Sequence, residues 1–417
     1  MPMGVGVGLP ASLSVVVVLG CAGGAAMTGP PASGGSGTTG GASGGAGAVG
    51  EASGSGGSPS GTGGAPPIGV TAILAGGGVG CAVVSGALQC WGDNTTGLLG
   101  ANAPAFCTVP VQVAGLGSSV SAAAIGTLHD CAVGGGALEC WGDNRFGQLG
   151  NGTTTNSATP VAVMGAPRAI TALSAGNELT CAVFGGAAEC WGSNQDSLLG
   201  IGTAPADSLV PVGVSGLASG VTAISVGDGH TCAVMDGAAY CWGSNEYGEL
   251  GVALTITGTG PFQLEDLRSG VTAISAGAYD SCAVANGGAW CWGENRYGEV
   301  GIGSMDITAT PAQVQGLTDG VTAIATGDFS TCAIVNGGVQ CWGLNERGQL
   351  GDGTTTSSAV PVQVQGLDSG VTALTMGDEF VCALVNGGVQ CWGYNPLGQL
   401  GNGSQLNSSV PVRVNLL

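Results

Sequence analysis

The chain repeats one unit of about fifty residues seven times, and this period restricts the possible folds more than any other feature of the sequence. Each unit has two cysteines nine residues apart, and the second cysteine is followed directly by Trp-Gly. Successive units begin 50 or 51 residues apart. The paired cysteines are Cys81 and Cys90, Cys131 and Cys140, Cys181 and Cys190, Cys232 and Cys241, Cys282 and Cys291, Cys332 and Cys341, and Cys382 and Cys391.

Every unit contains four short segments with the pattern of β-strands. In the sixth unit they are 321–325, 332–335, 338–342 and 360–364, and no segment has a sustained helical period. The period alone would also allow a solenoid, but antiparallel strands of this length favour the blades of a propeller. The predicted fold class is therefore all-β, a seven-bladed β-propeller with four antiparallel strands per blade.

A motif of the form Trp-Gly-x-Asn-x-x-Gly-(Gln/Glu/Leu)-Leu-Gly follows the second cysteine, and residues 342–351 show it well. Together with the Cys-Ala-(Val/Ile/Leu) at the first cysteine, it resembles the repeat of the regulator of chromosome condensation family. The resemblance covers all seven units and implies a seven-bladed propeller. The chain departs from the family pattern in places: Ser197 replaces a glycine, and the family's histidine before the first cysteine is present only as His129 and His230.

The two cysteines of a unit bracket a two-residue turn, which is Asn286-Gly287 in the fifth unit. Such pairs suit the primed turns that tight hairpins require. Counting outward from the turn places Cys282 opposite Cys291 in a non-hydrogen-bonded pair, with Cα atoms about 4.5 Å apart. We therefore predict one disulfide per blade. The alternatives are buried free thiols and a zinc site, although the C-x-x-C spacing typical of zinc is missing.

The tryptophan after each second cysteine should point to the opposite face of the blade, because side chains alternate along a strand. One face of each hairpin then presents sulfur and the other presents an indole. We expect each to pack against a neighbouring blade.

The first residues look like an export signal. Residues 1–21 end in Val18-Leu19-Gly20-Cys21, which resembles a bacterial lipobox, so Cys21 is the predicted lipidation site. No Lys or Arg precedes the apolar run, and ordinary secretion is the alternative. Residues 22–66 are Gly-, Ser- and Ala-rich and predict a disordered linker, followed by the propeller at 67–417. The expected location is the cell envelope, lipid-anchored and facing the periplasm or the exterior.

The charge balance excludes several classes of function. The formal net charge is −20, and all six basic residues are arginines. Nucleic acid is an unlikely match for such a surface, and a membrane would be reached only through the lipid anchor. The absence of lysine also excludes P-loop and Schiff-base chemistry. Sixteen cysteines suit an oxidising compartment.

No catalytic set is identifiable. His129-Asp130 and 228–230 place a histidine near a carboxylate, but no nucleophile accompanies them. The Gly-x-x-Gly strings lack the lysine and helix of a phosphate loop and indicate structural turns. Asp93 and Asp143 hint at calcium without a spaced ligand loop. We expect neither an enzyme nor a cofactor or metal.

Two points remain open in the sequence. Cys107 lies in an insertion of the first unit, where it is interpreted as a buried thiol, with pairing to a second molecule as the alternative. The last strand, 410–414, either completes the seventh blade or crosses to pair with the first.

Variable residues are concentrated in the first-to-second and third-to-fourth loops, which should share one face of the ring. The predicted function is a non-catalytic, surface-tethered protein that binds an extracytoplasmic protein through this face. The alternatives are a glycan- or cell-wall-binding module and, less favoured, a lyase or hydrolase; the rings could also simply fill the seams between blades. We expect a monomer. The candidate partner-binding residues are Arg145, Phe146, Tyr247, Tyr279, Arg296, Tyr297, Phe329, Arg347 and Phe380.

Overall fold

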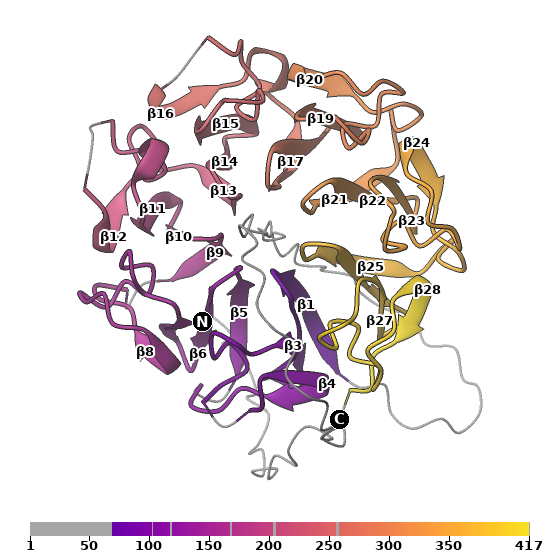
Figure 1. Ribbon diagram of the computed structural model, residues 1–417. Helices are drawn as coiled ribbons and strands as arrows, with labels where there is room; N and C mark the ends of the chain where they lie inside the picture. Colours follow the sequence, from indigo (N-terminus) through magenta and orange to yellow (C-terminus); the bar gives the residue numbers. More distant parts are fainter. Residues whose placement is uncertain are drawn as a thin grey trace, which may run out of the picture.

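The computed structural model describes residues 69–416 except 102, 117–118, 167–168, 203–205 and 256–257. These residues form a ring of seven four-stranded antiparallel sheets, each made of four consecutive strands (Figure 1). The predicted seven-bladed propeller is confirmed. The predicted signal peptide, Cys21 and the linker lie outside the described residues.

The first and second strands of each blade occupy the same two inner positions in all seven blades. The first strand borders the centre (Figure 1): β1 (Val70–Gly76), β5 (Val120–Ile125), β9 (Ile170–Ala175), β13 (Val221–Val226), β17 (Val271–Ala276), β21 (Val321–Thr326) and β25 (Val371–Met376). The second strand carries the first cysteine: β2 (Val79–Val84), β6 (His129–Gly134), β10 (Leu179–Phe184), β14 (His230–Met235), β18 (Asp280–Ala285), β22 (Ser330–Val335) and β26 (Phe380–Val385).

The two outer strands complete each blade. The third carries the second cysteine and the tryptophan: β3 (Ala87–Asp93), β7 (Ala137–Gly142), β11 (Ala187–Gly192), β15 (Ala238–Gly243), β19 (Gly288–Gly293), β23 (Gly338–Gly343) and β27 (Gly388–Gly393). The fourth lies at the rim: β4 (Phe106–Gln112), β8 (Ser157–Ala162), β12 (Ser208–Gly213), β16 (Gly258–Gln263), β20 (Thr308–Gln313), β24 (Ser358–Gln363) and β28 (Ser408–Arg413). Two short 3-10 turns are η1 (Gln195–Ser197) and η2 (Glu265–Leu267).

A disulfide crosses the central hairpin of every blade. In the fifth blade Cys282 lies opposite Cys291, and their Cα atoms are 4.1 Å apart. The turn residues Asn286 and Gly287 have φ angles of 52° and 83°, as a primed turn requires. All seven predicted disulfides are present, with Cα separations of 4.0–4.1 Å. Seven disulfides are typical of a protein from an oxidising compartment outside the cytosol.

Each seam between blades combines a disulfide with an indole from the next blade. Trp342 is fully buried against the Cys282–Cys291 pair, and its indole N–H donates to the Glu299 carbonyl at 2.8 Å. The tryptophan of each other blade makes the same bond to the preceding blade. The expected packing of sulfur on one face and indole on the other is confirmed.

The ring closes by side-chain packing and loop hydrogen bonds rather than by sharing a strand. β28 pairs with β27, so the last strand completes the seventh blade. Across the closing seam, Trp91 donates to the Gln399 carbonyl at 2.7 Å, and the Gly403 N–H donates to the Thr108 carbonyl at 2.8 Å. The first blade is therefore built entirely from one end of the described chain and the seventh entirely from the other.

The repeated Asn and Gly of the motif hold the third-to-fourth loop. The Asn345 side-chain oxygen accepts from the Leu350 N–H at 2.9 Å, and its amide donates to the carbonyl of Thr356. Gly348 has a φ of 84°, and a Cβ there would lie 2.5 Å from the Cα of Ser409 in the next blade. The Gly-x-x-Gly strings are thus structural turns, as predicted.

Cys107 differs from its prediction. It lies on β4 with no exposed surface, and it is disulfide-bonded, so the interpretation as a buried free thiol is wrong. The sequence count could not show this, because a lone cysteine in an insertion has no register from which to find a partner. No helix among the described residues is long and apolar enough to cross a membrane.

Candidate functional site

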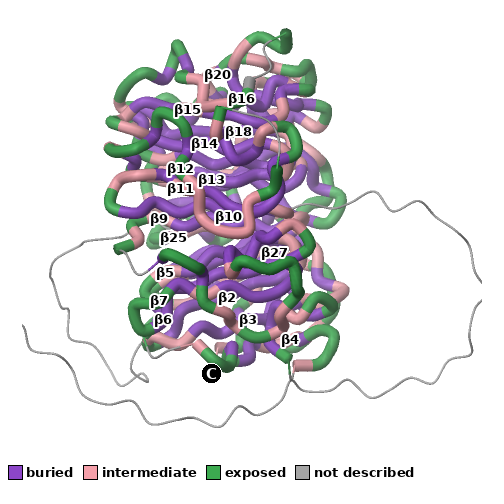
Figure 2. The backbone as a smooth tube through the Cα atoms, turned by 90° about the vertical axis from the view of Figure 1, so that its left-hand side faces the viewer, coloured by how far each residue is buried: buried purple, intermediate pink, exposed green. Residues whose placement is uncertain are grey.

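The exposed residues of the ring gather in the loops at its two faces, while the strands between them are largely buried (Figure 2). One face carries the tight hairpin turns. The other, called here the loop face, carries the first-to-second and third-to-fourth loops of each blade. The two kinds of loop were predicted to share one face, and this is confirmed. Tyr247 comes from a third-to-fourth loop and Tyr279 from a first-to-second loop, and their rings are 5.4 Å apart.

Four of the predicted rings form one cluster on the loop face, called here the aromatic patch. Tyr279 lies edge-on to Tyr247 and stacks with Phe329 at 5.9 Å. Tyr297 meets Phe329 edge-on at 5.3 Å. Arg296 pairs with Glu294 and lies 5.8 Å from the centre of the Phe329 ring. The patch thus joins three blades, and all four of its rings are half-buried.

The remaining predicted residues lie outside the aromatic patch. Arg145 bonds Asp143 at 2.7 Å and lies over Phe146. Arg347 lies 5.5 Å from the Tyr394 ring, a residue that the sequence prediction missed.

The structure corrects the prediction made for Phe380. Only 1% of its surface is exposed, and its side chain packs in the core cluster that closes the ring, so its assignment as a partner-binding residue is wrong. Its place at the start of the second strand directs it inward.

The two histidines bridge blades and are not part of an exposed site. Both are fully buried, and burial lowers the pKa of each to about 4, so they are neutral. The Thr180 hydroxyl donates to the Gln148 carbonyl, so His129 Nε2 must donate to that hydroxyl, at 2.6 Å. His230 makes the same contact with Ser281 at 2.7 Å.

Acidic residues surround the inner edge of the loop face, and sequence analysis did not select them. Burial is the largest cause that raises the pKa of Asp328 well above its usual value, and the negative charges of Asp378 and Asp228 raise it further. Burial, together with the smaller effect of the negative charges of Asp228 and Glu379, raises the pKa of Asp378 to about 7. Their first-to-second turns are also joined, because the Asp328 N–H donates to the Asp378 carbonyl. Asp228, Asp328 and Asp378 belong to three different blades, so only assembly of the ring reveals the cluster.

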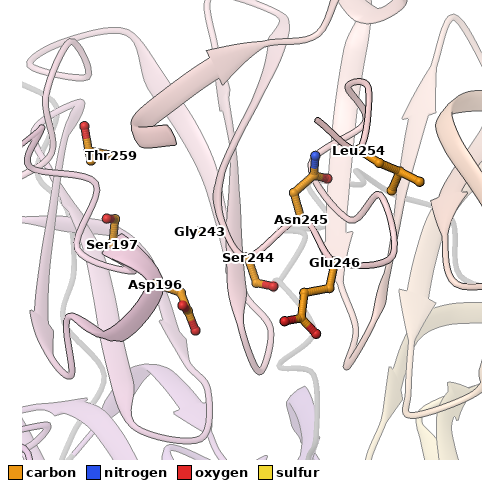
Figure 3. A pocket seen from close by; sticks show the side chains of 8 residues that line it. All are labelled: Asp196, Ser197, Gly243, Ser244, Asn245, Glu246, Leu254 and Thr259. Carbon is orange, nitrogen blue, oxygen red and sulfur yellow. The ribbon is translucent and has the colours of Figure 1, made fainter. Parts of the chain in front are cut away.

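Two adjoining cavities lie between the third and fourth blades on the loop face, and the inner one extends to the fifth blade. The inner one, of about 280 Å³, is lined by Glu178, Asp228, Glu249, Tyr247 and Tyr279 among others. The outer one, of about 420 Å³, reaches Leu254 and Thr259 near the rim. Asp196, Ser244 and Glu246 line both, and Figure 3 shows the two carboxylates on either side of Ser244. We call the two cavities together the acidic groove.

The acidic groove depends partly on the third blade, in which a serine replaces a glycine of the motif. Asp196 and Ser197 in η1 have φ angles of 52° and 66°, in the left-handed region that favours glycine. Ser197 stands where the motif has glycine, and this departure was the one signal of the groove in the sequence. Among the described residues, no group of three His, Cys, Asp or Glu side chains is placed to hold a metal ion.

This seven-bladed architecture defines the chain as a repeat propeller of the regulator of chromosome condensation type. The family model for the RCC1-like domain matches residues 90–417, and the chain belongs to that family. A search of curated proteins finds no match.

Solved structures share the fold at low identity. Prp20p from Saccharomyces cerevisiae, studied for its binding to Gsp1p and histones, is 19% identical with a TM-score of 0.69, over 79% of this chain and 85% of that chain. Human WBSCR16 is 20% identical with a TM-score of 0.68, over 78% of this chain and 94% of that chain. Yeast RCC1 (Prp20) bound to Kap60 is 19% identical with a TM-score of 0.67, over 79% of this chain and 83% of that chain.

The buried ionisable groups set how stability depends on pH. Burial raises the pKa of Glu299 to about 7, as it does for Asp378. A carboxyl with a raised folded-state pKa contributes stability that is complete below its unfolded pKa near 4, and this is lost as pH rises through about 7. The histidines act oppositely: their contribution is complete above about pH 6.5 and is lost as pH falls through about 4.

We expect the propeller to melt at a higher temperature at pH 5 than at pH 8. Three further buried aspartates also have raised pKa values, so the carboxyls outnumber the two histidines. Calorimetry across this range measures the difference. Glu299→Gln should reduce it, because the amide oxygen can still accept from the Tyr297 N–H without ionising. A higher melting temperature at pH 8 than at pH 5 would contradict the assignment.

Proposed function

We propose that this protein is a non-catalytic binding protein whose loop face engages another protein. The observation that carries the proposal is the aromatic patch, which places four half-buried rings from three blades on one face. Tyrosine and arginine are enriched among the residues that dominate the energy of protein interfaces. The scaffold beneath the patch is rigid, because every seam is closed by a disulfide and an indole.

The proposal is further supported by one comparison and one observation on this chain. Prp20p, with the same fold, is described by its binding to Gsp1p and histones, so one propeller of this shape engages proteins. The second concerns the two histidines, neither of which is exposed on the loop face as a general base. Both histidines are buried and hydrogen-bonded to the neighbouring blade.

The aromatic patch can be tested by truncating its rings. We expect Tyr279→Ala combined with Tyr297→Ala and Phe329→Ala to weaken partner capture at least tenfold, since a central hot-spot residue commonly contributes 2 kcal/mol or more. The assay is quantitative pull-down from an envelope protein fraction. The matched control is Phe106→Ala, which removes a ring that is 38% exposed on β4, away from the patch.

Capture unchanged by the triple variant, with the control also unchanged, would show that the patch does not bind the partner. A glycan array run with the same proteins tests the alternative function. Glycan binding that is lost in the triple variant, without any protein capture, would favour the glycan-binding module.

We also propose that the protein is tethered to the cell envelope through Cys21, on the basis of the lipobox-like 18–21 and the linker at 22–66. Cys21→Ser should then move the protein from the membrane fraction to the soluble fraction. Ser36→Ala is the matched control, because it changes one small residue of the predicted linker and should leave the protein on the membrane. Equal membrane retention of both variants would exclude the lipid tether.

A further inference from the structure

The acidic groove is a cavity with charge of one sign. Five carboxylates line it, and none of its described lining residues is an arginine or histidine; the chain has no lysine. The carboxylates are Glu178, Asp196, Asp228, Glu246 and Glu249.

The chain's own cations do not neutralise this charge. Arg145 is close enough to Glu178 to lower the pKa of that carboxyl, but its guanidinium is bonded to Asp143 at 2.7 Å. Burial is the larger effect, and the pKa of Glu178 is raised overall. Burial also raises the pKa of Glu249. A cation from outside the chain would therefore find carboxylates at a site that is partly withdrawn from water.

The inner end of the groove also has the rings that cations favour. Tyr247 and Tyr279 line the inner cavity and belong to the aromatic patch. A guanidinium or ammonium group is attracted to the face of an aromatic ring within about 6 Å. On this same face Arg145, Arg296 and Arg347 already lie 5.5–5.9 Å from ring centres.

An unpartnered carboxyl oxygen lies beside this end of the groove. Asp328 is only 8% exposed, and its Oδ1 has no hydrogen-bond partner. It is near enough to Tyr279 to contribute, with Asp228, to the raised pKa of that phenol, for which burial is the largest cause. Buried polar atoms are normally hydrogen-bonded, so this oxygen can accept from a donor that water or a ligand would supply.

The size and position of the groove favour a peptide over a metal ion. Its two cavities, of about 280 and 420 Å³, join through three shared residues into an elongated space. No three described ligands gather closely enough for a metal. The groove also continues directly into the aromatic patch, which shares Tyr247 and Tyr279 with it.

We propose that the acidic groove binds a lysine- or arginine-bearing segment of the partner protein while the aromatic patch contacts the rest of the partner. This deepens the proposed function and rests on it for the identity of the partner as a protein. The basic side chains would lie between Glu178, Asp196 and Glu246 and reach inward toward the tyrosine rings. The strongly acidic chain, with a net charge of −20, would also accelerate association with such a segment.

The test uses a fluorescent tetra-arginine peptide and the full chain at physiological salt, with fluorescence anisotropy as the measurement. We expect Glu178→Gln, Asp196→Asn and Glu246→Gln together to weaken peptide binding about tenfold, because three charge pairs with the peptide are lost. The matched control is Asp266→Asn, Asp319→Asn and Asp368→Asn. It removes the same charge from three exposed residues in the connections between blades, at the opposite face.

The outcomes separate specific binding from the general attraction of a negative protein. A control variant that weakens binding as much as the groove variant, or a groove variant that binds normally, overturns the proposal. Spermidine that binds the groove more tightly than the peptide overturns the assignment to a peptide. If the groove triple variant does not fold, the double variant of the exposed Asp196 and Glu246 replaces it.

The peptide assay does not require the natural partner, so its failure is distinguishable from failure of the proposed function. Loss of partner capture in the aromatic triple variant with no effect of the groove variant on the peptide would retain the binding face and reject the basic segment.

Discussion

Trp342→Ala is expected to lower the free energy of unfolding by about 3–5 kcal/mol, the range for removing a buried tryptophan or phenylalanine. Trp342 has no exposed surface and fills the seam beside the Cys282–Cys291 disulfide. The substitution leaves a cavity there and removes the indole N–H that donates to the Glu299 carbonyl. Denaturant titration with a constant m-value measures the loss.

The eighth tryptophan provides the control. Trp290 is half-buried on β19 and lies outside the repeated indole position. Trp290→Ala should cost about 1–2 kcal/mol, because less apolar surface is lost from the interior. The loss of stability in Trp342→Phe should lie between those of Trp290→Ala and Trp342→Ala, because phenylalanine keeps most of the ring packing and loses the hydrogen bond. Equal losses for Trp290→Ala and Trp342→Ala would show that the seams do not depend on the repeated indole.

Reduction of the seven hairpin disulfides is expected to unfold the propeller. Each closes a loop with a sequence separation of nine, which corresponds to about 2–3 kcal/mol of loop-closure entropy. Seven such contributions sum to roughly 14–21 kcal/mol if they are additive, compared with about 5–15 kcal/mol of net stability for a typical domain. The reduced chain should therefore lose its β-sheet circular dichroism at room temperature.

The graded version removes one disulfide. Cys332→Ser with Cys341→Ser should lower the free energy of unfolding by about 2–3 kcal/mol and leave the fold intact. Thiol labelling of the unreduced wild type should modify none of the fourteen hairpin cysteines, and labelling after reduction should modify all of them. A reduced chain that keeps its circular dichroism would show that the seams hold without the disulfides.

The scaffold was predictable because its determinants are local. The turn at Asn286-Gly287 sets the hairpin register, and the register places Cys282 opposite Cys291. The side-chain alternation of a strand then places the tryptophan on the other face. Each inference spans about ten residues, and the seven copies repeat it.

The site was only partly predictable because it forms between blades. Loop composition selected Tyr247, Tyr279 and Phe329, but no sequence rule gives the distances that join three blades into one aromatic patch. Phe380 was assigned wrongly because it sits at the strand boundary, where a shift of one residue exchanges a buried position for an exposed one. The acidic groove was missed because its carboxylates come from first-to-second and third-to-fourth loops of different units.

The most direct test of the account compares the two faces of one blade. A photo-crosslinking amino acid is placed at Tyr279 on the loop face or at Asn286 in the tight turn on the opposite face, and adducts formed on the producing cells are identified by mass spectrometry. The account predicts an adduct with one partner protein from position 279, none from position 286, and an attachment site near Lys or Arg residues of that partner. An adduct from position 286 alone, or equal adducts from both positions, would contradict it.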